Sequence, residues 1–209
     1  MMLILPVDLG KVGDYSALAL IETKPEAYHI RHLQRLPLGT DYTTQVYVVA
    51  QLMALIRRQE QAEPVLVVDG TGVGAPVVDM FRKCGLRPIA ITITSGQHVS
   101  TDMGLSGIGY HVPKADLIGA LAVALQGNIL KVSPKIPDSK AFLTELQNFK
   151  FRVSGSGNAS FNAEGKDHDD LLMAVALGVW YAGRHPERRK DRCFGIAGGP
   201  RIHSAGHGM

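Results

Sequence analysis

Three separated segments of the sequence place aspartates at the ends of expected secondary-structure elements. Asp8 and Asp69 each close a short apolar run, and Asp169 with Asp170 precede a long apolar stretch. Taken singly, each of these residues is compatible with an ordinary turn or helix cap. Taken together, they indicate a shared acidic site, because strand ends and helix starts can meet at one edge of an α/β sheet.

A cluster of carboxylates has a recognisable chemistry. Like charges repel, so such a cluster needs cations to neutralise it. Mg²⁺ prefers oxygen ligands, and two ions about 3.5–4 Å apart can activate a water and stabilise the leaving oxygen of a phosphodiester. The sequence therefore predicts metal-assisted phosphodiester hydrolysis. The choice between Asp169 and Asp170 stays open, because neighbours on a helix diverge by about 100°.

The amino-terminal segments that must position Asp8 are predicted to be strands. Residues 3–8, 16–22 and 28–36 combine apolar runs or alternation with intervening turns, which predicts an antiparallel three-strand meander. Residues 41–61 carry apolar positions at helical spacing, with Asp41 or Thr43 available as the amino-terminal cap.

The following segments alternate between the two element types, which is typical of an α/β fold with a mixed central sheet and flanking helices. Residues 64–69 predict a strand buried on both faces, because the run is almost continuously apolar. The rest predicts a helix to about residue 84, a strand at 87–94, a mobile loop at 95–109, a helix at 113–125, a strand at 129–132, a helix at 138–149, a hairpin or loop at 151–161, and a final helix at 169–181.

Length and composition indicate one folded domain, at residues 1–183, followed by a tail at 184–209. The 209 residues are 45% hydrophobic, which is enough for one good core. The tail is rich in glycine and histidine from Gly195 onward and is expected to be disordered. It begins with a basic cluster: Arg184, His185, Arg188, Arg189, Lys190 and Arg192. This cluster is compatible with a solvated segment and with an arm that contacts phosphate.

Several classes of protein are disfavoured. No apolar run approaches the roughly 20 residues of a spanning helix, so no membrane association and an intracellular location are expected. Cys84 and Cys193 lie far apart and suggest neither a disulfide framework nor a zinc site. The sequence has no Gly-x-x-x-x-Gly-Lys-Ser/Thr loop, so it encodes no nucleotide-driven motor of the P-loop type.

Four motifs, in this order and spacing, resemble a known family across residues 3–182. They are Val7-Asp8-Leu9-Gly10 with Gly13-Asp14-Tyr15-Ser16-Ala17-Leu18, Val68-Asp69-Gly70-Thr71-Gly72-Val73-Gly74, Val112-Pro113-Lys114-Ala115-Asp116-Leu117-Ile118, and His168-Asp169-Asp170 before Ala174. The sequence is similar in these motifs to the carboxyl-terminal nuclease domain of the large terminase subunit that packages tailed-phage genomes.

The resemblance implies an RNase H-like fold, two Mg²⁺ or Mn²⁺ ions, and cleavage of concatemeric double-stranded DNA with little sequence preference. It implies Asp8, Asp69 and Asp170 as metal ligands, with Asp169 as the fourth candidate and Asp167 as a weaker one. It leaves three candidates for contacts with DNA phosphate: Lys11, Lys114 and His168.

The family carries an ATPase motor upstream of its nuclease, whereas this sequence begins almost at the first expected strand. An excised domain, a separately encoded fragment and a prophage remnant are all compatible with this start. The candidate partners are a separate ATPase motor, a small terminase subunit and a portal. The expected location is the cytoplasm of a phage-infected or prophage-bearing host cell.

Three alternative hypotheses use the same residues differently. The turns at Asp8-Leu9-Gly10 and Asp69-Gly70-Thr71-Gly72 also resemble the phosphate-binding turns of actin, Hsp70 and sugar kinases, although that architecture normally needs two such domains. A Holliday-junction resolvase would share the fold and the metals but would form obligate dimers on branched DNA. A catalytically inactive module that binds only DNA or a portal is disfavoured by the intact aspartates.

Overall fold

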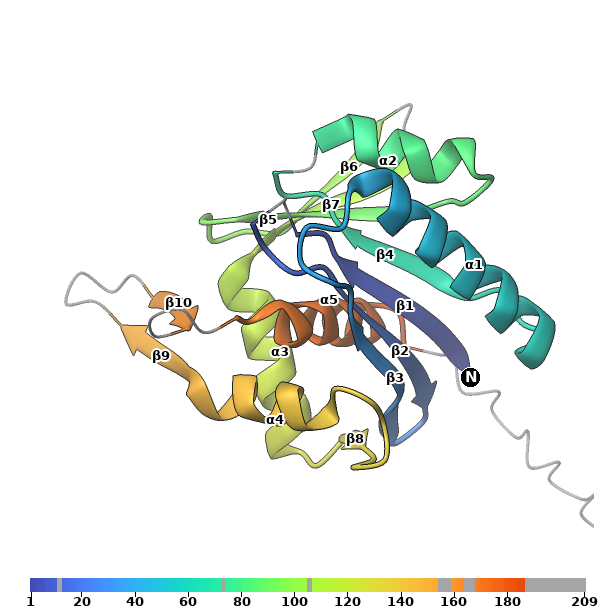
Figure 1. The fold of residues 1–209 in the computed structure, drawn as a ribbon. Helices are drawn as coiled ribbons and strands as arrows, with labels where there is room; N and C mark the ends of the chain where they lie inside the picture. The colour runs from blue at the N-terminus through green and yellow to red at the C-terminus, as the bar shows by residue number, and fades with distance from the viewer. Residues whose placement is uncertain (11–12, 73, 105–106, 154–158, 164–167, 187–209) are drawn as a thin grey trace, which may run out of the picture.

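A mixed eight-stranded sheet lies between two layers of helices in the computed structural model, which describes residues 1–10, 13–72, 74–104, 107–153, 159–163 and 168–186 (Figure 1). The strand order is β6-β7-β5-β4-β1-β2-β3-β8. Its strands are β1 (Met2–Asp8), β2 (Ala17–Lys24), β3 (Ala27–Arg35), β4 (Val65–Asp69), β5 (Ile89–Thr94), β6 (Ser100–Gly104), β7 (Gly107–Pro113) and β8 (Leu130–Val132).

The amino-terminal meander is confirmed. β1 pairs antiparallel with β2, and β2 pairs antiparallel with β3. On its other side β1 runs parallel to β4, and β4, β5 and β7 continue in parallel. β1 and β4 are thus central strands covered on both faces, which accounts for the nearly continuous apolar runs before Asp8 and Asp69.

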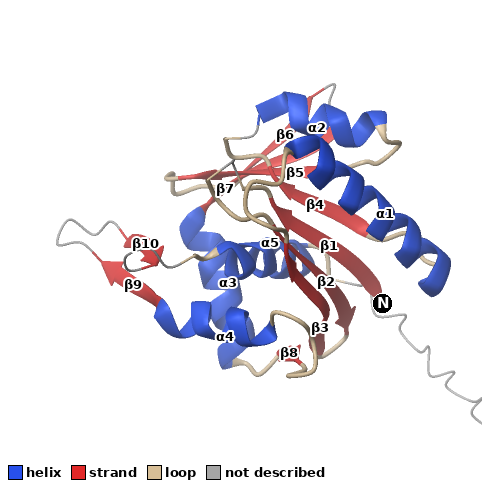
Figure 2. Ribbon diagram, in the orientation of Figure 1, coloured by secondary structure: helices blue, strands red, loops and turns tan. Residues whose placement is uncertain are grey.

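Helices cover both faces of the sheet (Figure 2). One face is covered by α1 (Tyr42–Glu60) and α2 (Gly74–Lys83), and the other by α3 (Lys114–Gln126), α4 (Ser139–Asn148) and α5 (Asp170–Arg184). Successive residues of β1 serve the two cores in turn, because strand side chains alternate between faces: Leu3 and Leu5 join the cluster under α1, and Ile4 joins the one under α5. Asp41 caps α1, as expected, by accepting the Thr44 N–H at 3.0 Å.

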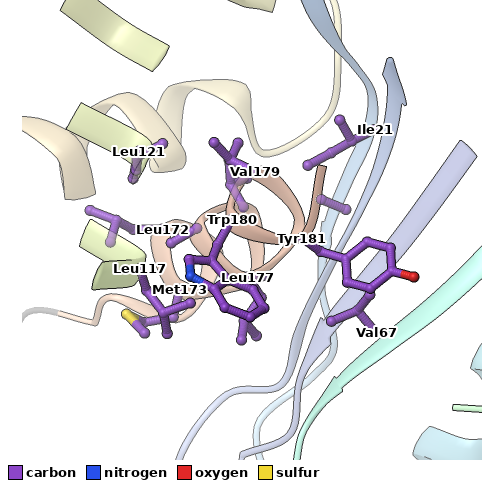
Figure 3. Close-up of a cluster of buried hydrophobic side chains, with 14 of the residues drawn as sticks. Ile21, Val67, Leu117, Leu121, Leu172, Met173, Leu177, Val179, Trp180 and Tyr181 are labelled. Carbon is purple, nitrogen blue, oxygen red and sulfur yellow. The ribbon is translucent and has the colours of Figure 1, made fainter. Parts of the chain in front are cut away.

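The last helix, α5, is the centre of the larger core (Figure 3). Residues 170–182 are all buried, so this helix is apolar around its circumference rather than along one stripe. It packs on β1 and β2 so closely that a Cβ at Gly178 would lie 2.7 Å from Ile21 Cδ1 and 2.8 Å from Pro6 Cγ. A larger residue at this crossing would require the side chains of Ile21 and Pro6 to shift.

The expectation of a mobile loop at residues 95–109 was wrong for residues 100–104 and 107–109, which form strands, whereas residues 95–99 lie outside any strand. β6 and β7 pair antiparallel at the edge of the sheet, with Met103 opposite Ile108. Ser100 and Gly104 lie in β6, which tolerates such residues because one side of an edge strand lacks a partner. β9 (Phe149–Val153) and β10 (Ala159–Ala163) pair antiparallel as a separate two-stranded sheet, in agreement with the hairpin alternative for residues 151–161.

The tail from residue 187 onward, with most of its basic cluster and Cys193, lies outside the described residues. No helix in the described part of the chain is both long enough and apolar enough to cross a membrane.

Candidate active site

Asp8 and Asp69 lie side by side at the carboxyl edge of the sheet. Their strands run parallel, and Val7 of β1 pairs with Val68 of β4, so the residues that follow are neighbours. Their carboxylates act on each other electrostatically, because the negative charge of Asp69 helps to raise the pKa of Asp8. The sequence-based expectation that these two aspartates adjoin is met by the fold.

Local hydrogen bonds hold both strand ends. Asp69 Oδ1 accepts the N–H of Thr71 at 2.7 Å, and the Thr71 hydroxyl oxygen accepts the N–H of Ile93 in β5 at 2.6 Å. After Asp8 the chain turns back so tightly that a Cβ at Gly10 would lie 2.2 Å from the Tyr15 carbonyl oxygen. The Gly10 N–H donates to the Ser16 hydroxyl at 3.0 Å, so the loop is fixed at its root.

The start of α5 brings the second pair of aspartates to the same edge. Asp170 is buried, whereas the side chain of Asp169 remains 31% exposed and lies 3.3 Å from Lys114 Nζ. The adjacent residues therefore differ in environment: Asp170 belongs to the interior of the cluster, and Asp169 to its rim.

The four carboxylates act on one another electrostatically. The pKa of Asp8 is raised well above its usual value, first by burial and then by the negative charges of Asp69, Asp170 and Asp169, against which Lys114 acts. Burial also raises the pKa of Asp69. The pKa of Asp170 is raised by burial and opposed chiefly by Arg35. Without cations, these groups tend to retain protons.

The donor set fits a hard divalent cation. It consists of carboxylate oxygens, which Mg²⁺ prefers, and Asp170 Oδ2 is buried without a hydrogen-bond partner among the described residues. In the described part of the chain, no three His, Cys, Asp or Glu side chains stand close enough together to form a completed metal-binding group.

The candidate phosphate contacts fall at the rim. Lys114 begins α3 beside the cluster, and its ammonium also lies 6.0 Å from the centre of the Phe149 ring. His168 is exposed, with Nδ1 3.7 Å from Asp170 Oδ2 and its ring edge-on to Tyr15. Lys11 and Asp167, the other two candidates, lie outside the described residues.

Sequence reasoning missed two charged residues that contact this site. Arg35 at the end of β3 lies with Nε 3.6 Å from Asp170 Oδ2, and Glu145 of α4 bonds both Arg35 and the backbone of α5. A signal for Glu145 was available, because it follows Phe142 by three residues and so shares the buried face of its helix. A carboxylate on a buried face calls for a partner.

The fold and this edge together define the class of protein. The order β3-β2-β1-β4-β5, with acidic residues at the ends of the adjacent strands β1 and β4 and at the start of a covering helix, is an RNase H-like α/β arrangement. The expected fold class is confirmed.

Comparison with known proteins narrows the class. The chain matches no known family model. It is 28% identical over 170 residues, 81% of its length, to the large terminase subunit of Thermus phage G20c. It also resembles the crystal structure of the G20c large terminase nuclease with bound magnesium, with a TM-score of 0.63, 26% identity, and coverage of 85% of this chain and 80% of that one. The same nuclease with bound cobalt gives a TM-score of 0.61.

The resemblance to terminase nuclease domains is therefore confirmed by both sequence and structure. This chain spans 30% of the length of the full G20c subunit but matches 80% of the separate nuclease structure. The similarity thus concerns the nuclease part of the larger protein.

Proposed function

We propose that this chain is an endonuclease that hydrolyses phosphodiester bonds of double-stranded DNA with two Mg²⁺ or Mn²⁺ ions. Asp8, Asp69 and Asp170 are the proposed ligands, with Asp169 as the fourth. The observation that carries the proposal is that four carboxylates from β1, β4 and α5 meet at one edge of the sheet. The charges of Asp69, Asp170 and Asp169 raise the pKa of Asp8, and burial raises the pKa values of Asp69 and Asp170. Magnesium and cobalt in the G20c nuclease structures support the choice of divalent metals.

The proposed roles follow from each side chain's surroundings. When bound, the two ions would supply charge neutralisation and an activated water for in-line displacement. Asp8 and Asp69, at the ends of the adjacent parallel strands β1 and β4, would hold a cation together. Asp170 offers an oxygen without a hydrogen bond. The backbone N–H of Thr71 holds the Asp69 carboxylate in orientation.

Lys114 has a proposed double role at the rim of the cluster. Without metal its ammonium pairs with Asp169 and lowers the pKa of Asp8 and Asp69. When cations neutralise the carboxylates, this ammonium is free to contact a phosphate of the DNA backbone. His168, exposed beside Asp170, is a second candidate for such a contact, as is Lys11.

The proposed biological role of the cleavage reaction comes from the proteins that this chain resembles. Large terminase subunits are the matched proteins, so the proposed role is the cleavage step of phage genome packaging. Its proposed partners are DNA, an ATPase motor, a small terminase subunit and a portal. The proposed location is the cytoplasm of a phage-infected or prophage-bearing cell.

Plasmid cleavage tests the proposal. Purified chain is incubated with supercoiled plasmid in Mg²⁺, in Mn²⁺ or in EDTA, alongside Asp8→Asn and Asp69→Asn. Nicking and linearisation are expected with metal alone, and both variants are expected to be inactive yet folded. Wild-type activity in both variants would overturn the assignment of the site.

Two further substrates separate the rival readings. A four-way DNA junction cleaved in preference to the plasmid would favour a resolvase. Nucleotide binding without cleavage would favour the actin and Hsp70 class. Either result would contradict the proposal.

A further inference from the structure

The guanidinium of Arg35 lies between two carboxylates from different helices. Its Nη2 donates a hydrogen bond to Glu145 Oε1 in α4, and its Nε lies 3.6 Å from Asp170 Oδ2 in α5. The guanidinium carbon also lies 5.0 Å from the centre of the Tyr15 ring. Arg35 is therefore held on three sides at the border of the acidic cluster.

The two contacts of Arg35 are unequal. The one to Glu145 is a charge-assisted hydrogen bond, whereas 3.6 Å is too long for a hydrogen bond to Asp170. Arg35 Nε and Asp170 Oδ2 are both buried, and neither has a hydrogen-bond partner among the described residues. The lone pairs of Asp170 Oδ2 thus stay available, although a cationic donor is close by.

Glu145 also holds the helix that carries Asp170. Its second oxygen, Oε2, accepts the Leu172 N–H at 2.7 Å, in the first turn of α5. Asp169, at the amino-terminal cap position of this helix, makes no capping hydrogen bond with its own side chain. One buried carboxylate therefore fixes both the start of α5 and the arginine beside it.

We infer that Glu145 is a positioning residue that holds the Arg35 guanidinium away from Asp170, so that Asp170 Oδ2 can take a divalent cation. The inference deepens the proposed function and rests on it. If Glu145 lost its charge, Arg35 would keep only one buried anionic partner. Arginine forms strong bidentate pairs with carboxylates, so it would then close onto Asp170 and compete with the metal.

Glu145→Gln is the variant that isolates this effect. The glutamine amide oxygen can still accept the Leu172 N–H, so the cap of α5 is kept while the charge is removed. Mn²⁺ binding is measured by calorimetric titration of the full chain at about pH 8.5, where wild-type Glu145, with a pKa raised by burial to about 7, is ionised. The dissociation constant is expected to rise roughly tenfold in this variant.

The second variant adds Arg35→Gln to Glu145→Gln. With both charges gone, no cation competes for Asp170, and the Mn²⁺ dissociation constant is expected to return to within about threefold of wild type. Glu63→Gln is the matched control, since Glu63 pairs with Arg57 in an exposed ion pair. It is expected to leave both Mn²⁺ affinity and melting temperature unchanged.

The outcomes separate the inference from the proposed function. Unchanged affinity in Glu145→Gln would overturn the inference. A loss that the double variant fails to restore would also overturn it, because it would show that Glu145 acts only by supporting the fold. No Mn²⁺ binding by the wild-type chain would remove the proposed metal site itself, and the inference with it.

Discussion

The first turn of α5 and the remainder of the same helix have opposite surroundings. Asp170 is buried beside like charges with one oxygen lacking a hydrogen bond, whereas residues 171–182 are buried among apolar side chains from α3 and the sheet (Figure 3). The packed length of the helix supplies the stability that a buried, repelling carboxylate removes. The apolar residues 171–182 thus hold the proposed functional first turn in place. Substitutions in the first turn should change activity, and substitutions in the rest of the helix should change stability.

The largest expected effect comes from the first turn. Asp170→Asn removes a proposed ligand, so plasmid cleavage is expected to fall by about 10³-fold, equivalent to about 4 kcal/mol. The metal-free variant is expected to melt about 2–4 °C higher, since the raised pKa of Asp170 shows that its charge is unfavourable in the fold.

Its control is Asp79→Asn, which alters an exposed aspartate of α2 paired with Arg82. Cleavage by that variant should match wild type. If Asp170→Asn cleaved as well as the control, Asp170 would have no place in the site.

The body of the helix should respond in the opposite way. Leu177→Ala opens a cavity at a fully buried position and is expected to cost about 2–5 kcal/mol of unfolding free energy. Thermal melting reports that loss, while Mn²⁺ affinity at a temperature where the variant is folded should stay within about twofold of wild type. A large loss of affinity in the folded variant would contradict the division of α5 into two parts.

The pH dependence of stability should come from the acidic edge. Burial raises the pKa of Glu145 from 4.5 to about 7, so the native chain holds this proton more tightly than the unfolded chain. Its contribution is therefore full below about pH 4.5 and is lost as the pH rises to about 7, amounting to about 1–3 kcal/mol. The raised pKa values of Asp8, Asp69 and Asp170 act in the same direction.

Denaturant unfolding of the metal-free chain from pH 4.5 to 8 measures this effect. Glu145→Gln should show a shallower decline than wild type. A stability that increased with pH throughout this range would contradict the assignment of raised pKa values.

The smallest effect on stability is expected at the rim. Lys114→Met breaks a partly exposed pair with Asp169, which is worth less than about 1 kcal/mol. Cleavage is nevertheless expected to fall about tenfold and to depend less steeply on salt, because one phosphate contact is lost. Unchanged cleavage and salt dependence would assign Lys114 only to the metal-free ion pair.

Periodicity and strand-end chemistry predict much of this molecule. The apolar runs ending at Asp8 and Asp69 indicate central strands, and the strand ends of neighbouring parallel strands then meet. The edge strand β6 could not be predicted in the same way, because an edge strand carries little apolar signal. Helical spacing places Glu145 on the buried face of its helix, but it could not predict Arg35 as the partner, because the two positions lie 110 residues apart.

The most direct measurement is anomalous X-ray scattering from crystals of the chain grown with Mn²⁺. A metal peak is expected among the carboxylates of Asp8, Asp69 and Asp170, with a loss of the peak in Asp8→Asn crystals. Ordered Mn²⁺ only at other surfaces, or no peak at this edge of the sheet, would contradict the claim that these aspartates form a metal-dependent nuclease site.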